Sequence, residues 1–187
     1  MIRGGAEGTA ESAGLDEVPS PAAARLIGLL RAGGWTLATC ESLTGGGIGA
    51  TLTSVPGAST VFRGGLITYA SDLKASLAGV DADFIAEHGV INGRTAQEMA
   101  IGAANSCRAD IGLSCTGVAG PDGEDGEAPG TVWLGLALPT GWDDRIRGRL
   151  LRLHGERGQI RAQTISSALA WLSECLGEAP RATDKTS

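Results

Sequence analysis

Apolar residues recur along the chain with the period of a helix in three long segments. The first follows Ser20 and Pro21, and its apolar residues within 26–30 fall on one side. Ser20 suits the N-cap of this helix and Pro21 its first turn. Helical spacing also covers about 92–107 and 157–176. These patterns predict three amphipathic helices.

Shorter apolar runs between these segments predict strands. They cover 35–40, 62–70, 109–116, 131–138 and 147–153. Short helices are expected at 48–52 and 72–79. Ser71 or Asp72 can cap the second of these helices, and Gly79 can end it.

Strands that alternate with helices are typical of a layered α/β domain with a largely parallel sheet. A chain of 187 residues favours one domain, and we assign it to 20–177. The flanks, 1–19 and 178–187, lack apolar periodicity, so we expect disordered tails.

The composition of the chain argues against several classes of function. The formal net charge is -6 and no run of Lys or Arg occurs, so a nucleic-acid surface is disfavoured. The four cysteines are scattered without metal-ligand spacing. No segment has the apolar length of a membrane span or a signal peptide. We therefore expect a cytoplasmic protein that binds neither nucleic acid nor membranes.

Polar residues gather where three predicted strands end, at 41–44, 69–74 and 116–130. In open α/β sheets, ligand sites form at the carboxyl ends of the strands. The coincidence predicts a site that combines these three junctions.

Ser42 can act as a nucleophile if a base removes its proton. His88 and His154 lie at element boundaries, where a structural role is the more frequent one. Lys74 is the lysine within the predicted domain, and burial can lower its pKa until it is a neutral base. Tyr69 can orient or relay the proton. A solvated Lys74 with no catalytic role is equally compatible with the pattern.

Three other features leave alternatives open. Ser71 and Lys74 fit S-x-x-K, so Ser71 is a rival nucleophile, although the companion motifs are missing. The glycines of 45–47 precede a predicted helix and can hold an anion or an oxyanion, or form a plain tight turn. The carboxylates of 121–127 can ligate a metal, but a solvated acidic loop fits their spacing better.

Four motifs in order resemble one family. They are TCESLTGG at 39–46, VPGASTVFRGG at 55–65, YASDLK at 69–74 and TGVAGPDGE at 116–124, the last followed by PGTVW. The family's own patterns are A-E-S-C-T-G-G, VPGSS-x-x-F-x-G-G, Y-S-N-E-A-K and S-G-I-A-G-P-D-G-G. The chain thus resembles the C-terminal domain of the competence-damage-inducible protein CinA over about 20–177. This family also includes a stand-alone nicotinamide mononucleotide deamidase.

The resemblance implies a three-layer α/β/α domain with a mixed, mostly parallel sheet. It also implies hydrolysis of nicotinamide mononucleotide to the acid and ammonia, without a cofactor or metal, in pyridine-nucleotide recycling. Ser42 would be the nucleophile, Lys74 its base, and Tyr69 the relay or orienting residue. The positions implied to contact the substrate are Glu41, Thr44, Gly45, Gly46, Thr116, Gly117, Gly120, Arg157 and Arg161, with the two arginines as candidate phosphate ligands.

The chain departs from the family pattern beside the expected site. Leu43 stands where the family usually has Cys, Ser71 where it has Asn, and Asp72 where it has Glu. Asp72 would keep Lys74 protonated if it faced the lysine. Ala162 follows Arg161 where a second basic residue is frequent, which leaves another small carboxamide open as the substrate.

A second hypothesis is a non-catalytic module that binds a nucleotide or a partner protein through the same pocket. An intact set of Ser42, Lys74 and Tyr69 favours the enzyme. The 42% hydrophobic content and the family analogy favour a homodimer.

Overall fold

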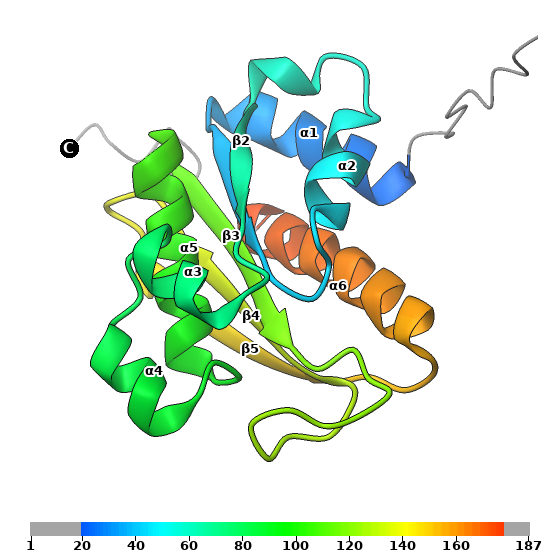
Figure 1. Cartoon of the computed structure of the whole chain (residues 1–187). Helices are drawn as coiled ribbons and strands as arrows, with labels where there is room; N and C mark the ends of the chain where they lie inside the picture. The colour runs from blue at the N-terminus through cyan, green and yellow to red at the C-terminus, as the bar shows by residue number, and fades with distance from the viewer. Residues whose placement is uncertain (1–19, 178–187) are drawn as a thin grey trace, which may run out of the picture.

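The computed structural model describes residues 20–177 (Figure 1). The strands are β1 (Leu37–Glu41), β2 (Phe62–Ile67), β3 (Ile111–Gly117), β4 (Thr131–Ala137) and β5 (Ile146–Arg152). The α-helices are α1 (Pro21–Gly33), α2 (Gly47–Thr53), α3 (Ser71–Ser76), α4 (Ala82–His88), α5 (Gly93–Cys107) and α6 (Arg157–Gly177), and a 3-10 turn, η1, covers Ala58–Thr60. The predicted tails, 1–19 and 178–187, lie outside the described residues.

The five strands form one mixed sheet in the order β2-β1-β3-β4-β5. β1 pairs in parallel with β2 and with β3, whereas β4 is antiparallel to both of its neighbours. Four strands therefore share one direction, as the family resemblance implies. In this register Glu41 at the end of β1 lies between Ile67 of β2 and Cys115 of β3. The three polar junctions thus meet at one edge of the sheet.

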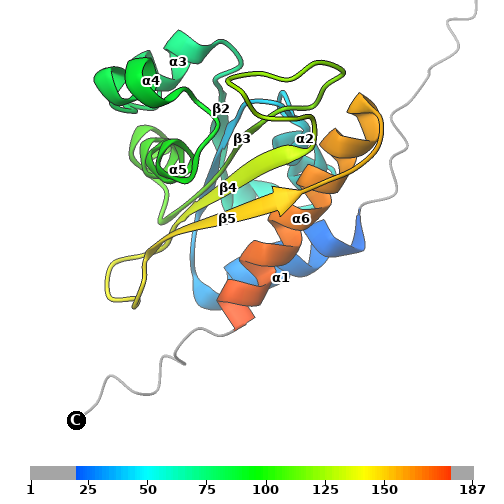
Figure 2. The same ribbon diagram turned by 90° about the horizontal axis from the view of Figure 1, so that it is seen from below.

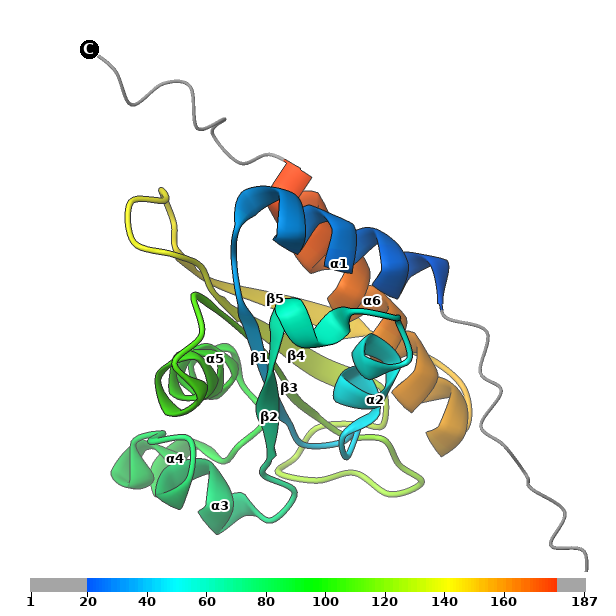
Figure 3. The same ribbon diagram turned by 90° about the horizontal axis from the view of Figure 1, so that it is seen from above.

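Helices cover both faces of the sheet and make three layers. Helices α1, α2 and α6 pack on one face, and α5 packs across the other, with α3 and α4 outside it (Figures 2 and 3). Along β1 the buried side chains alternate between these faces, since Leu37 joins the core under α1 and α6 while Ala38 joins the core under α5. The expected three-layer α/β/α domain is confirmed.

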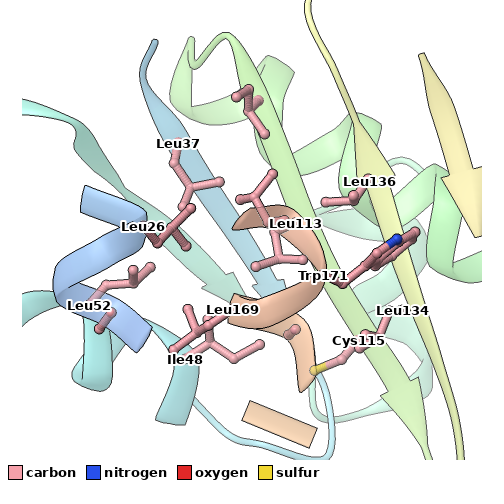
Figure 4. Close-up of a cluster of buried hydrophobic side chains, with 14 of the residues drawn as sticks. Leu26, Leu37, Ile48, Leu52, Leu113, Cys115, Leu134, Leu136, Leu169 and Trp171 are labelled. Atoms are coloured by element: carbon pink, nitrogen blue, oxygen red, sulfur yellow. The ribbon is translucent and has the colours of Figure 1, made fainter. Parts of the chain in front are cut away.

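The larger core lies between the sheet and helices α1, α2 and α6. Leu169 and Trp171 of α6 belong to one buried cluster with Leu113 of β3 and Leu134 of β4 (Figure 4). Every residue of β1 is buried, as expected of a central strand covered on both faces. On α6 the side chains of Ile160, Leu169 and Leu172 are buried, whereas Ile165 is partly buried at the edge of this core.

Two glycines let α5 approach its neighbours closely. A Cβ on Gly102 of α5 would collide with the backbone of Ala78, and one on Gly112 of β3 would collide with the backbone of Ala100. Because the obstructing atoms are backbone, they cannot move aside as a flexible side chain would. The smaller core of α5, which includes Met99 and Ala103, depends on this approach.

Most boundaries fall within a few residues of the predictions, with two differences. The N-cap of α3 is Ala70 rather than Ser71 or Asp72, and no side-chain cap forms, because Ser71 is already the first helical residue. Helix α4 has no counterpart among the predicted helices, although it ends at His88, where an element boundary is expected. Its N-cap is Asp81, whose carboxylate accepts the N–H groups of Asp83 and Phe84. Within 20–177, no helix has the length and apolar character needed to cross a membrane.

The close approach of α5 leads to a stability prediction. Gly102→Ala should lower the free energy of unfolding by about 1–3 kcal/mol, because the new methyl group has no room beside Ala78. Gly28→Ala is the matched control, since Gly28 is an exposed glycine of α1 with open space around it. This control should gain about 1 kcal/mol from helix propensity. Urea unfolding of both variants measures the difference, and equal gains would contradict the packing argument.

Candidate active site

A cavity of about 240 Å³ lies at the carboxyl edge of the parallel strands. All three polar junctions contribute to its wall, as the sequence predicted. The lining residues are Ser42, Leu43, Tyr69, Lys74, Val90, Ile91, Thr116, Gly117, Val118, Ala119, Gly120, Asp122, Gly123, Glu124 and Arg157. Its volume is slightly below the roughly 300–1,000 Å³ of pockets for drug-sized ligands, so a small polar molecule suits it.

Ser42 and Lys74 meet in the wall of this cavity. The Nζ of Lys74 lies 3.1 Å from the Oγ of Ser42 and donates a second hydrogen bond of 2.9 Å to the Thr68 carbonyl. Helix α3 starts just after β2, so Lys74 on its first turns reaches back to the end of β1. The two residues lie 32 positions apart in sequence but within hydrogen-bond reach. A nucleophile and a base in this arrangement can open a covalent reaction.

Lys74 is buried without a carboxylate partner. Its side chain is 1% exposed, and it forms no ion pair with any residue in 20–177. Burial therefore lowers the pKa of Lys74 below 10.5, and the nearby carboxylates of Glu124 and Asp125 only partly oppose this shift. The solvated alternative for Lys74 is wrong for this fold, and the exposed side chain of Asp72 does not pair with it.

Glu41 has its contacts inside the protein rather than in the cavity. Its buried carboxyl group accepts the N–H groups of Ile48 and Gly49, at 2.9 and 2.8 Å. The same group also accepts the hydroxyls of Thr44, at 2.7 Å, and Thr39, at 3.3 Å. Glu41 thus caps α2 from the end of β1 and fixes the turn that carries Ser42. Neither Glu41 nor Thr44 lines the cavity, so their substrate contacts stay predictions.

The glycine turn differs from the expected anion site. Gly45 donates its N–H to the carbonyl of Ser42 and Gly47 to that of Thr44, while the next two N–H groups go to Glu41. Gly45 and Gly46 have φ angles of 60° and 93°, which only glycine adopts easily. The expectation that this turn offers free N–H groups to an oxyanion is therefore wrong for the groups already paired. The alternative of a tight turn describes this segment.

Tyr69 lines the mouth of the cavity, where Arg157 holds it. The Nη2 of Arg157 donates a hydrogen bond of 2.7 Å to the Tyr69 hydroxyl, and its Nη1 donates one of 3.0 Å to the Gly120 carbonyl. Within 20–177, no hydrogen bond joins Tyr69 to Ser42 or Lys74. A relay through Tyr69 would therefore require it to exchange its present partner.

Arg161 lies one helical turn beyond Arg157 on α6, but it faces the back of the Ser42 turn. Its Nε donates to the Leu43 carbonyl at 3.1 Å and its Nη2 to the Thr44 carbonyl at 2.8 Å. Arg161 does not line the cavity. Of the two candidate phosphate ligands, the structure thus brings Arg157 to the cavity and assigns Arg161 contacts with the backbone.

The predicted loop residues Thr116, Gly117 and Gly120 all line the cavity. The Thr116 hydroxyl donates to the Val90 carbonyl at 2.9 Å and so joins β3 to the segment before α5. Their contacts with a substrate stay predictions. Val90 and Ile91, which no motif singled out, form an apolar part of the wall. Val90 and Ile91 are buried because their segment packs beside β3, and this packing has no local signal in the sequence.

Residues considered as rivals lie elsewhere. Ser71 is exposed, and Lys74 bonds Ser42 instead, so the S-x-x-K alternative has no support from the geometry. His88 and His154 are exposed and do not line the cavity. Burial raises the pKa of Cys40 to about 11 and that of Cys115 to about 12, so both remain thiols near neutral pH.

Comparisons with known proteins agree on one family. The CinA C-terminal domain model matches residues 20–176. A CinA-like protein of Frankia casuarinae is 43% identical over 155 residues, which are 83% of this chain and 35% of that protein. The chain spans about a third of the length of the curated relatives that it matches.

Solved structures give the same result. A CinA superfamily protein from Klebsiella pneumoniae has a TM-score of 0.80 and 31% identity, covering 84% of this chain and 97% of that one. The competence/damage inducible protein CihA from Agrobacterium tumefaciens has a TM-score of 0.77 and 33% identity, covering 84% of this chain and 94% of that one.

The buried cap at Glu41 leads to a second prediction. Glu41→Ala should lower the free energy of unfolding by about 2–4 kcal/mol, because two backbone N–H groups of α2 and the Thr44 hydroxyl lose their acceptor. Denaturant unfolding gives the value. Glu87→Ala, at an exposed position of α4, should stay within about 0.5 kcal/mol of wild type. A loss at Glu41 no larger than at Glu87 would contradict the capping role.

The burial of Lys74 leads to a pH-dependent prediction. Between its lowered folded pKa and 10.5, the unfolded chain binds more protons at this residue, so wild-type stability should rise with pH there. Below the pKa of Lys74 in the folded protein, the buried amine is charged, and the free energy of unfolding is reduced by the full cost of burying that charge. Lys74→Met should lack this rise and gain most, relative to wild type, at the lower pH values. Unfolding free energies measured at several pH values test this, and an unchanged slope in the variant would refute it.

Proposed function

Because the chain belongs to the CinA C-terminal domain family, we propose that it is an amidohydrolase acting on nicotinamide mononucleotide, with nicotinic acid mononucleotide and ammonia as products. Such an enzyme would serve pyridine-nucleotide recycling. The observation that carries the proposal is the hydrogen bond of 3.1 Å between Lys74 and Ser42 in the wall of a cavity. A buried lysine with a lowered pKa beside a serine is a feature that a mere binding module does not need.

The proposed reaction uses Lys74 as the carrier of one proton. Lys74 as a neutral amine takes the Ser42 proton while Oγ bonds the carboxamide carbon. The ammonium then returns this proton to the amide nitrogen, the C–N bond breaks and ammonia leaves. Water attacks the resulting ester, passes a proton through Lys74 to Ser42, and releases the acid. Ser42 and the neutral amine of Lys74 are restored.

The charges of the wall support a nucleotide as the substrate. Arg157 lies at the mouth, and a guanidinium can donate two hydrogen bonds to a phosphate. In the proposed complex the carboxamide reaches Ser42 and the phosphate stays near Arg157. A phosphate there competes with the Tyr69 hydroxyl and the Gly120 carbonyl for the same guanidinium. Tyr69 is then free to orient the substrate, which is the role we propose for it.

The direct test is release of ammonia from nicotinamide mononucleotide by purified protein. Wild type should be active, and Ser42→Ala and Lys74→Met should each lose at least about a thousandfold in kcat, since nucleophile and base act together. Ser71→Ala is the matched control and should retain activity, because its exposed hydroxyl lies away from Lys74. Binding of the nucleotide by an inactive wild type would favour the binding module instead.

The pH profile tests the role of Lys74 separately. The base must be neutral, so kcat/KM should fall about tenfold for each pH unit below the lowered pKa of Lys74. At higher pH the rate should reach a plateau. A rate that does not change with pH on the acidic side would exclude Lys74 as the base.

A further inference from the structure

The loop of residues 118–130 carries four carboxylates, which divide into two pairs. Asp125 and Glu127 tie the loop to the rest of the domain. The N–H of Val90 donates to Asp125 at 2.8 Å, and Arg152 pairs with Glu127 at 3.4 Å. Arg157 adds a third tie through the Gly120 carbonyl. The loop is therefore a fixed wall of the cavity.

Asp122 and Glu124 are the other pair. Both line the cavity that contains Ser42 and Lys74, and both are exposed to its open space. Among residues 20–177, neither side chain accepts a hydrogen bond or forms an ion pair. The carboxylates of Glu124 and Asp125 both oppose the lowering of the Lys74 pKa, so the acidic loop acts electrostatically on the reaction centre, and Glu124 does so from the cavity wall.

The carboxylates of Asp122 and Glu124 therefore make no contact within 20–177 that stabilises the fold, and they place negative charge on one side of the cavity. Arg157 at the mouth gives it a positive one. A ligand that matches both carries an anionic group near Arg157 and a positive charge near the loop. The described residues include no group of three or more His, Cys, Asp or Glu side chains placed to hold a metal ion, so an organic cation suits this wall better.

We propose that Asp122 and Glu124 are specificity-determining residues that select carboxamides on a positively charged, N-substituted pyridinium ring over neutral rings of the same shape. This inference rests on the proposed function. Glu124 stands where the family pattern given above has glycine. The interaction is with a solvent-facing carboxylate, so it should weaken as salt increases.

The effect of ring charge can be measured apart from ring shape by comparing two forms of the same nucleotide. Oxidised nicotinamide mononucleotide has a cationic ring, and its 1,4-dihydro form has a neutral one with the same substituents. Calorimetry with the Ser42→Ala protein gives the dissociation constant of each form without turnover. The oxidised form should have the smaller dissociation constant of the two. Glu124→Gln in this background should reduce the ratio of the dihydro constant to the oxidised one about threefold to fivefold, and Asp122→Asn with Glu124→Gln should reduce it further.

Asp72→Asn is the matched control, because it removes an exposed carboxylate of α3 that does not line the cavity. It should leave the ratio unchanged. Equal ratios in the Ser42→Ala protein and its Glu124→Gln variant would overturn the inference, as would failure of both nucleotide forms to bind. Ammonia release by wild type decides the proposed function independently. A protein that releases ammonia without preferring the oxidised ring keeps its function and loses this selectivity.

Discussion

The structure around the candidate site depends on one buried carboxyl group. Glu41 ends β1, and the helix α2 begins six residues later with N–H groups that need acceptors. The Glu41 carboxyl provides both acceptors and also binds two threonine hydroxyls. This single group connects the central strand, the glycine turn and the helix. Ser42 follows it directly, so its position is set by a contact with the helix rather than by a flexible loop.

The opposite condition holds at Lys74, which has no carboxylate partner. A charged amine in that position would lack the compensation that buried charges usually receive. The protein tolerates this because the amine has two oxygen acceptors, one on Ser42 and one on Thr68. The stability lost by burying Lys74 is consistent with a functional site, where such costs are commonly found. Glu41, with hydrogen bonds to four donors, therefore has a structural role. Lys74, which has no carboxylate partner within 20–177, is the residue expected to take part in the reaction.

Local patterns predicted most of the helices and strands, because hydrophobic spacing is a local signal, but they missed α4 and the antiparallel direction of β4. Helical spacing located α1, α5 and α6, and strand runs located all five strands. The pairing of Ser42 with Lys74 was predictable because both follow strands whose ends meet in a parallel sheet. The partners of Glu41, Arg157 and Arg161 were not predictable. Each of these side chains has several possible partners, and the choice depends on distances that exist only after the layers pack. The paired N–H groups of the glycine turn were missed for the same reason.

The contact between Arg161 and the Ser42 turn has a consequence for folding. Arg161 lies 118 positions along the chain from Leu43 and 117 from Thr44. Arg157 lies 88 positions from Tyr69. Loop closure over such separations is slow and entropically costly, so contacts of this kind form late. A ribosome has to synthesise most of the domain before α6 can fix the turn that carries Ser42. Ser42 and Lys74 lie only 32 positions apart, so they can meet before α6 is made, whereas the turn that carries Ser42 gains its last contacts only when α6 packs against it.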